Sequence, residues 1–198
     1  MGLKTLIKKI ASEFLKSKID YMITGGQAVL IYGEPRLTKD IDITLGIPPD
    51  KLDDVLKIAK KLKLKILPQD PHNFVKETMV LPLLDEKTGL RIDLIFSLSE
   101  YEKEALKRVK KINIKGVDVN YISIEDLIIH KIISGRERDI EDLKYILVKN
   151  KKIDEKYILK WLKEFEKVLN RNLIETFIKI RCKNENPQIK NLSTNSTL

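Results

Sequence analysis

The order of strand-like and helix-like segments is the feature that most limits the fold of this chain. Apolar residues at strand spacing alternate with apolar residues at helical spacing up to about residue 121, and only helical spacing follows. Alternation of this kind favours a sheet covered by helices, and the later run favours a helical bundle. The sequence therefore predicts an α/β (α+β) region followed by a C-terminal helical bundle.

Spacing and turn residues place the expected elements along the chain. Strands are expected over 21–24, 39–45, 73–82 and 90–96, a hairpin over 111–121, and helices over 3–18, 27–32, 50–62, 99–109, 124–134, 136–149, 154–168 and 170–181. These elements suggest a core over 1–122, a helical region over 123–183 and a tail over 184–198. The tail is rich in Asn, Ser and Thr, which is typical of disorder. Whether the first two parts share one hydrophobic core is left open.

The charge and the scarcity of aromatic residues bound the class of partner. A formal net charge of +9 attracts anions, so nucleic acid and phosphorylated small molecules are both candidate partners. A solvated lysine-rich surface explains the charge equally well, because the lysines are spread along the chain. Aromatic residues make up only 6%, which argues against a stacking platform for single-stranded nucleic acid. The single cysteine and the lack of a long apolar run favour a cytoplasmic chain without a membrane span.

Two acids stand at alternate positions of one strand-like segment. Asp40 and Asp42 should leave the same face of the strand, while Ile41 and Ile43 point into the core. Two carboxylates so placed repel each other unless a cation lies between them. Hard divalent ions such as magnesium take oxygen ligands and also bind substrate phosphates. The pair is therefore a candidate metal site, and a solvated strand face is the alternative.

A third acid, Asp93, lies in the apolar segment that follows Arg91. A neighbouring strand would bring it beside Asp40 and Asp42, and three carboxylates around one point suit two metal ions. Asp93 is then a candidate metal ligand and the acceptor of a proton from an attacking hydroxyl. A salt bridge between Asp93 and Arg91, or a neighbouring lysine, is the alternative.

A glycine pair, Gly25 and Gly26, stands where a strand-like segment becomes a helix. Glycine lets backbone N–H groups approach a ligand closely, and a helix N-terminus favours phosphate. Thr24 is a candidate cap of that helix or a donor to a phosphate oxygen. A simple turn is the commoner explanation of such a pair. In this order before the acids, a phosphate cradle is favoured.

The segment over residues 23–44 resembles the signature of the polymerase-beta nucleotidyltransferase superfamily. That signature is a hydrophobic residue, Gly, Gly or Ser, a gap, and then an acid, a hydrophobic residue and a second acid. The resemblance implies a small mixed-sheet core, two magnesium ions (with manganese as the alternative) and transfer of a nucleoside monophosphate from a nucleoside triphosphate, with release of pyrophosphate. It gives Asp40 and Asp42 metal roles and gives Asp93 the third-acid role. Lys39, directly before the first acid, is a further candidate for a nucleotide contact.

The stretch over residues 126–143 is similar to the helical part of the AbiEii-type nucleotidyltransferases, which include toxins of type IV toxin–antitoxin systems. Those proteins carry a Lys on one helix and an Arg-rich turn leading to an Asp on the next, and Lys131 and Asp139 fall on these positions. Lys131 is a candidate for neutralising triphosphate charge, and so is Arg136 or Arg138. Asp139 would orient Lys131 or Arg136. A helix corner tied by surface ion pairs is the alternative.

The combined pattern predicts a magnesium-dependent nucleotidyltransferase that uses a nucleoside triphosphate. The acceptor hydroxyl is left open among tRNA or other RNA, a protein and a small molecule, and the resemblance adds an antitoxin protein as a candidate partner. Gln27 stands where many relatives have a serine, so a serine contact to phosphate is missing. A non-catalytic nucleotide- or RNA-binding module of the same fold, and an enzyme moving only the gamma-phosphoryl group, are the alternatives.

Overall fold

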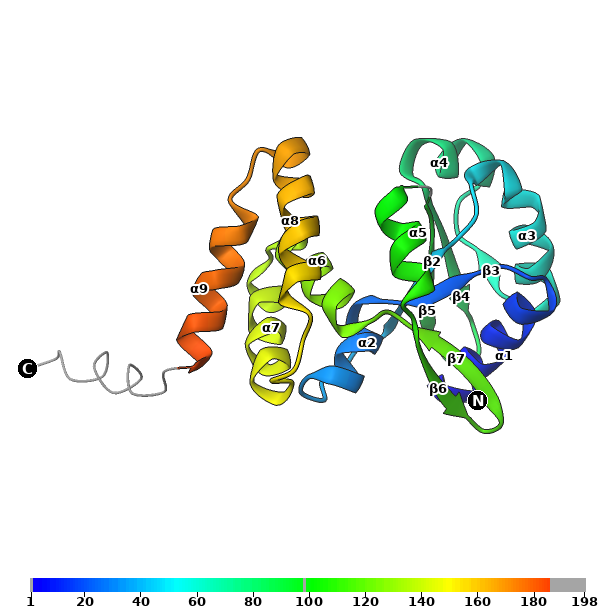
Figure 1. Cartoon of the computed structure of the whole chain (residues 1–198). Helices are drawn as coiled ribbons and strands as arrows, with labels where there is room; N and C mark the ends of the chain where they lie inside the picture. The colour runs from blue at the N-terminus through cyan, green and yellow to red at the C-terminus, as the bar shows by residue number, and fades with distance from the viewer. Residues whose placement is uncertain (1, 98, 186–198) are drawn as a thin grey trace, which may run out of the picture. The chain divides into compact units, whose positions relative to one another are not determined.

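The computed structural model describes residues 2–97 and 99–185, which form two compact units (Figure 1). The first unit contains the described residues up to Ala28 together with Arg36–Ser123. The second contains Val29–Pro35 and the described residues from Ile124 onward. No helix in the described ranges is long and apolar enough to cross a membrane. The predicted tail over 184–198 lies beyond the described residues, apart from its first two positions, which are helical.

A mixed sheet of seven strands forms the centre of the first unit, as far as the described residues go. Its order is β3-β4-β5-β2-β1-β7-β6. The pairs β2–β5 and β1–β7 are parallel and the other pairs are antiparallel, which confirms the predicted mixed α/β fold. The strands are β1 (Tyr21–Ile23), β2 (Asp40–Leu45), β3 (Lys65–Ile66), β4 (Val80–Asp85), β5 (Leu90–Phe96), β6 (Lys110–Ile114) and β7 (Val117–Tyr121).

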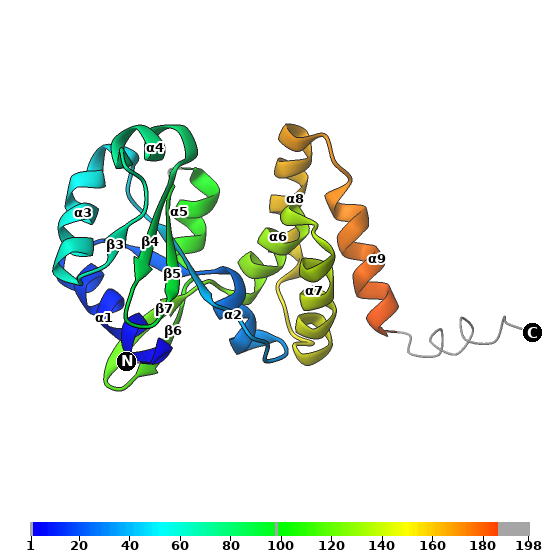
Figure 2. The same ribbon diagram turned by 180° about the vertical axis from the view of Figure 1, so that it is seen from behind.

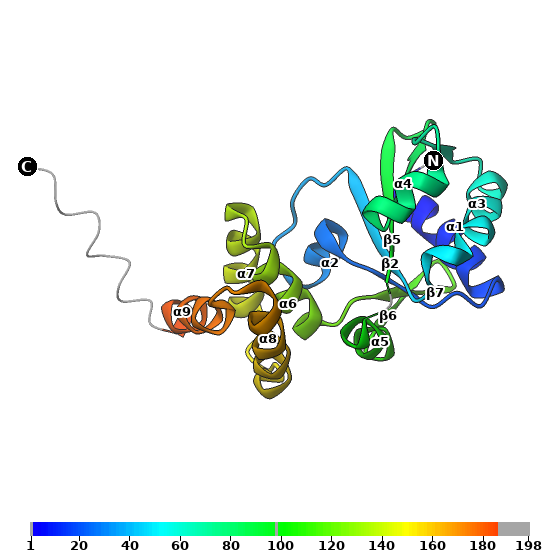
Figure 3. The ribbon, with the colours of Figure 1, turned by 90° about the horizontal axis from the view of Figure 1, so that it is seen from above.

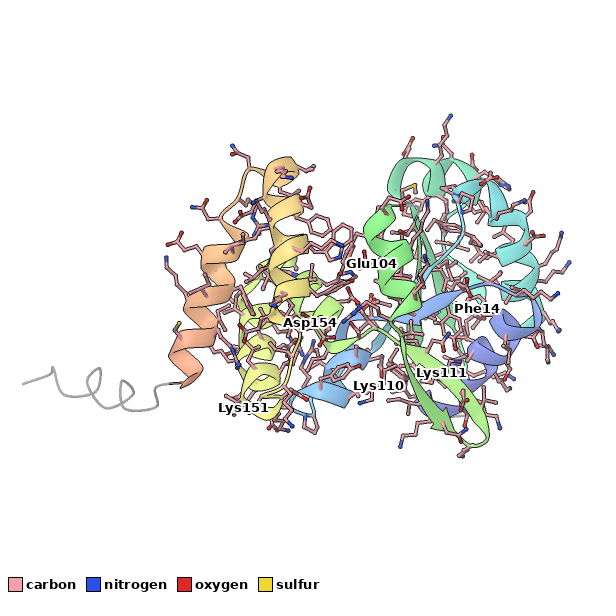
Figure 4. All side chains as sticks on the ribbon, viewed as in Figure 1. Phe14, Glu104, Lys110, Lys111, Lys151 and Asp154 are labelled. Carbon is pink, nitrogen blue, oxygen red and sulfur yellow. The ribbon has the colours of Figure 1, made fainter. Side chains whose placement is uncertain are left out.

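Helices α1 (Leu3–Lys16) and α3 (Leu52–Lys61) lie together on one face of this sheet (Figure 3). Side chains of both helices meet Ile92 and Leu94 of β5 in the core. Phe14 of α1 packs on Tyr21 of β1 with 5.2 Å between ring centroids (Figure 4). The unit also contains the short helix η1 (Pro49–Lys51), α4 (Pro71–Thr78), α5 (Glu100–Lys107) and the first turn of α2 (Gly25–Tyr32).

The second unit is helical, as predicted for the C-terminal part of the chain. Figure 2 shows its helices from behind: α6 (Ile124–Ser134), α7 (Glu137–Lys149), α8 (Glu155–Leu169) and α9 (Leu173–Glu185). Their shared core contains Leu127, Ile128, Leu143, Ile146, Leu162 and Phe177, which are almost fully buried. The last turn of α2 also belongs to this unit.

The structure differs from the predicted elements in three places, each for an identifiable reason. The expected strand over 73–82 is helix α4 as far as Thr78, because the Asp70 side chain accepts from the Asn73 N–H and Pro71 opens the helix. The two-residue strand β3 was not expected, since so short a segment carries no alternation. Helix α9 begins at Leu173 instead of residue 170, because Asn170 adopts a left-handed conformation that ends α8.

Candidate active site

The register of β2 on β5 brings the predicted acids of the two strands together on one face of the sheet. Asp42 lies directly opposite Asp93 in this parallel pair, and Asp40 lies opposite Arg91. Neighbouring strands are about 4.8 Å apart, so the Asp42 and Asp93 side chains leave the sheet side by side. The residues between the acids, such as Ile41 and Ile92, are completely buried on the other face. The predicted convergence of three acids on one face therefore follows from the strand register.

The carboxylate of Asp93 is held by Arg91 in this structure. Asp93 Oδ1 accepts a hydrogen bond from Arg91 Nε at 2.9 Å, so the salt bridge considered from the sequence is present. Within the described ranges, no group of three or more His, Cys, Asp or Glu side chains is arranged to hold a metal ion. Asp40 is exposed and Asp42 is partly exposed, so solvent reaches this face. The acids share a face, and the third is engaged by an arginine.

The glycine-opened tip of α2 lies directly against this acidic face. Gly25 has a φ of +57°, and a Cβ added there would stand 1.9 Å from Oδ2 of Asp42. The backbone of Thr24 also donates to the Asp42 carbonyl at 2.9 Å. The Thr24 hydroxyl is buried and points to that same carbonyl at 3.4 Å, so its local role is to join β1 to β2. Only a residue without a side chain fits at position 25.

Replacing Gly25 with alanine should displace the Asp42 carboxylate and lower any transfer activity by about a hundredfold, the cost of a misplacement near 1 Å. Gly89→Ala is the matched control, because Gly89 has a φ of +69° but a Cβ added there would meet no atom within 4 Å. Both variants carry the left-handed backbone cost of roughly 1–2 kcal/mol, and only Gly25→Ala adds the collision. Equal activities of the two variants would refute the role of the Gly25–Asp42 approach.

Three residues for which the sequence predicted no site role surround the start of β2. Buried Gln27 donates through Nε2 to the Asp40 carbonyl at 3.2 Å, and the Thr38 hydroxyl approaches the same oxygen at 3.5 Å. An atom of the Arg36 guanidinium lies 3.5 Å from the point where a Cβ on Gly26 would stand. A polar residue inside an otherwise apolar helix was the available signal for Gln27. Arg36 lies in the segment between α2 and β2, where no sequence pattern marked it.

The basic candidates before β2 therefore comprise two residues. Lys39 is exposed, and Arg36 is partly exposed beside the glycine pair. Their positive charges accompany the helix N-terminus, which itself carries a partial positive charge. This corner of the first unit thus places an anion-attracting backbone next to a face of three carboxylates.

The second unit contains the remaining predicted residues in a buried ionic cluster. Lys131 is only 5% exposed, and its ammonium donates to Asp139 at 2.5 Å and to Asp142 at 2.7 Å. Asp139 also accepts from the Ser134 hydroxyl at 2.6 Å and from Arg136 Nε at 2.9 Å. The cluster ties α6 to α7 from inside the helical unit, so these are not the surface ion pairs considered from the sequence. The Arg136 side chain remains 80% exposed.

The cluster should make the second unit sensitive to acid. Burial works to raise the pKa of Asp139, but hydrogen bonds from Lys131, Ser134 and Arg136 outweigh it and hold the pKa below its ordinary value. The folded state therefore favours charged Asp139. Its contribution to stability is complete above the unfolded pKa of about 3.9 and is lost as the pH falls through the lower folded value.

Urea unfolding followed by the fluorescence of Trp161, the one tryptophan in the sequence, checks this expectation in the second unit. The wild-type chain should lose stability as the pH falls below about 4, and Asp139→Asn should be weaker at neutral pH but change less with acid. Hydrogen bonds from Lys167 and Lys179 lower the pKa values of Glu164 and Glu175. These two groups are present in the wild type and in the variant alike, so they do not contribute to the difference between the two. Parallel curves for the two chains would contradict the assignment.

Comparison with protein families identifies one match across nearly the whole chain. A family model described as a nucleotidyltransferase of unknown function (DUF6036) matches residues 2–185. No curated protein matches the sequence. The matched range includes both compact units, so the family description applies to the sheet with its acids and to the helices that follow.

Solved structures with a similar fold include three of nucleotidyltransferase type. A nucleotidyltransferase-like antigen of Paracoccidioides brasiliensis is 21% identical, with a TM-score of 0.52 over 73% of this chain and 75% of that one. The solution structure of the antibiotic-resistance factor ANT(2'')-Ia is 15% identical, with a TM-score of 0.58 over 84% of this chain and 95% of that one. The crystal structure of ANT(2'')-Ia in complex with adenylyl-2''-tobramycin is 18% identical in sequence. Its TM-score is 0.51 over 73% of this chain and 87% of that one. At such identities the likeness establishes a shared fold and nothing finer.

Proposed function

Because the chain belongs to the DUF6036 family of nucleotidyltransferases, we propose that it transfers a nucleoside monophosphate from a nucleoside triphosphate to a hydroxyl acceptor. The acceptor oxygen would attack the alpha-phosphorus, the bond from that phosphorus to the bridging oxygen would break, and pyrophosphate would leave. The proton of the hydroxyl would pass to a carboxylate. The observation that carries this proposal is the placement of Asp42 beside Asp93, with the tip of α2 against Asp42.

The donor set of this face fits divalent magnesium, with two ions in the proposal and manganese as a substitute. Three carboxylates leave one side of two paired strands, and hard cations prefer such oxygen ligands. Asp40 and Asp42 are the ligands proposed first, because neither depends on breaking the Arg91 pair. When bound, the ions supply neutralisation of phosphate charge and activation of the attacking hydroxyl.

The protein groups have separate proposed tasks. Asp93, released from Arg91, accepts the hydroxyl proton and completes the ligand set. The backbone N–H groups at Gly25 and Gly26 hold phosphate oxygens, supported by Lys39 and Arg36. Phosphoryl chemistry depends mainly on positioning and charge stabilisation, so these contacts account for most of the expected acceleration.

The acceptor is proposed as a class and not as one compound. ANT(2'')-Ia, whose fold is shared, is in complex with adenylyl-2''-tobramycin in one of the compared structures. This complex supports testing aminoglycosides as acceptors. RNA, including tRNA, and protein hydroxyls are tested beside them. The AbiEii-type toxin role, an antitoxin partner and a cytoplasmic location stay predictions from the sequence. The triphosphate-neutralising roles of Lys131, Arg136 and Asp139 also stay predictions.

A binding module without turnover is the second candidate, and the Arg91–Asp93 pair favours it. In that case Arg91 would stay paired with Asp93 permanently, and nucleotide would bind without reaction. Calorimetry with nucleoside triphosphate, with and without magnesium, would then give metal-dependent binding and no labelled product. Arg91→Ala separates the cases further, because it frees Asp93 and should raise transfer if the pair restrains a working enzyme.

Labelled triphosphates test the proposal directly. The full chain is incubated with magnesium, with each triphosphate labelled at the alpha position or, in a parallel series, at the gamma position, and in turn with total RNA, cell protein and aminoglycosides. Label on an acceptor from the alpha position supports nucleotidyl transfer. Label only from the gamma position identifies a phosphotransferase instead, and the absence of any label with bound nucleotide identifies the binding module.

A further inference from the structure

Two lysine-rich hollows lie along α1 and α3 of the first unit. The first encloses about 440 Å³ and is lined by lysines from α1, from the end of α3 and from the β4–β5 turn, namely Lys8, Lys9, Lys16, Lys61, Lys63 and Lys87. The second encloses about 500 Å³, adds Lys18, Lys51 and Lys57, and shares Glu13 and Lys61 with the first. We call the nine lysines together the lysine surface.

Three acids line these hollows, and each has a partner. Asp54 is exposed and pairs with Lys57 at 3.0 Å. Glu13 is 8% exposed and pairs with Lys16 at 3.0 Å and with Lys61 at 2.5 Å, so it positions two ammonium groups while cancelling one charge. Asp85 is 3% exposed and accepts from the Thr88 hydroxyl at 2.6 Å. The surface therefore keeps a clear excess of positive charge.

The lysine surface lies on the side of the sheet away from the acids. Ile92 and Leu94 of β5 face α1 and α3, while Asp93 between them leaves the opposite face. Lysines on the outer side of these two helices are thus separated from Asp42 by a helix layer and the sheet. Their charge cannot serve a triphosphate at the candidate active site.

The chemistry of the lining favours a phosphate backbone over other polyanionic partners. The apolar stripe of α1, including Leu6, Ile10 and Phe14, is buried in the core, so this stripe is not available to insert into a bilayer. Neither hollow has an aromatic or arginine residue among its described lining, whereas protein interfaces concentrate binding energy in Trp, Tyr and Arg and are depleted in Lys. Lysines act as point charges that suit phosphates.

We propose that the lysine surface binds the phosphodiester backbone of a double-helical nucleic acid without reading its sequence. Helix α1 has 14 residues and is about 21 Å long, so the lysines along it can meet several successive phosphates. A duplex is favoured over a single strand because no aromatic side chain is there to stack on bases. This binding is independent of the proposed transfer reaction.

The test uses the full chain, a fluorescent RNA hairpin and a DNA duplex of the same sequence, without nucleotide. The variant Lys9→Glu/Lys63→Glu/Lys87→Glu changes three exposed lysines whose side chains make no hydrogen bond or ion pair within the described residues. Anisotropy titrations at several salt concentrations should give binding that this variant weakens about tenfold or more. Its salt slope should fall by about 3, one for each lost phosphate contact.

The control is Lys76→Glu/Lys107→Glu/Lys111→Glu, which makes the same change of net charge at exposed lysines outside both hollows. Circular dichroism melting confirms that both variants fold. Binding of either duplex that is lost only in the first variant supports the proposal, and the two duplexes distinguish RNA from DNA. Equal losses in both variants, no duplex binding, or binding of anionic vesicles in place of duplexes would overturn it.

Discussion

Asp42→Asn should reduce nucleotidyl transfer by about a thousandfold or more while the protein stays folded. The substitution removes one negative charge from the face that β2 and β5 share, with almost no change of shape. A metal ligand contributes several kcal/mol of charge stabilisation, and each 1.36 kcal/mol is about tenfold in rate. Transfer of alpha label to the best acceptor measures the loss, and circular dichroism measures the fold.

Asp20→Asn is the matched control for this experiment. It makes the same chemical change at an exposed residue just before β1, and the Asp20 backbone carbonyl that accepts from Gly46 is unaffected. Activity near the wild-type level is expected. If Asp42→Asn retained more than about a tenth of the wild-type activity, the acids would not carry the reaction and the binding module would become the better explanation.

Lys131→Met should destabilise the helical unit by about 3–5 kcal/mol. Methionine fills a similar volume, but it leaves Asp139 and Asp142 buried without the ammonium that both accept from. Removing one partner of a buried ion pair leaves an uncompensated charge, which is the costly case. Trp161 fluorescence during urea unfolding measures the loss.

Two further variants show whether this cost belongs to the cluster. Lys156→Met removes an exposed lysine of α8 and should change stability by less than about 0.5 kcal/mol. Adding Asp139→Asn to Lys131→Met should recover part of the loss, because one of the two carboxylates that lost the Lys131 ammonium is then neutral. Unchanged stability with lost nucleotide binding would instead support the predicted triphosphate role of Lys131.

The mixed fold and the shared acidic face followed from local patterns. In β2 and β5, polar and buried residues alternate with the period of a strand, so the sequence itself assigned Asp40, Asp42 and Asp93 to faces. The sequence predicted that a neighbouring strand would bring Asp93 beside the pair, and the resemblance to a known superfamily gave Asp93 the third-acid role. The parallel pairing that sets Asp42 opposite Asp93 was not predicted. Strand register of this kind is invisible to the pattern of one strand alone.

Features that depend on contacts distant in the sequence could not be predicted in the same way. The burial of Lys131 follows from the packing of α6 on α7, and its neighbours in the sequence do not reveal it. Arg36 gains its importance from the approach of Gly26, ten positions earlier in the chain. Helix α4 was missed because the apolar residues around Val75 fit a strand, whereas the deciding signals were the Asp70 cap and Pro71.

The ion pair between Arg91 and Asp93 neutralises part of the negative charge on the acidic face. The Arg91 guanidinium already pairs with the Asp93 carboxylate, so an incoming divalent ion must compete with this arginine for the carboxylate. Under the proposed function, free magnesium alone should therefore saturate this face poorly. Magnesium that is bound to a triphosphate already has phosphate ligands, which offset the cost of separating Asp93 from Arg91. Nucleotide and metal would therefore bind together.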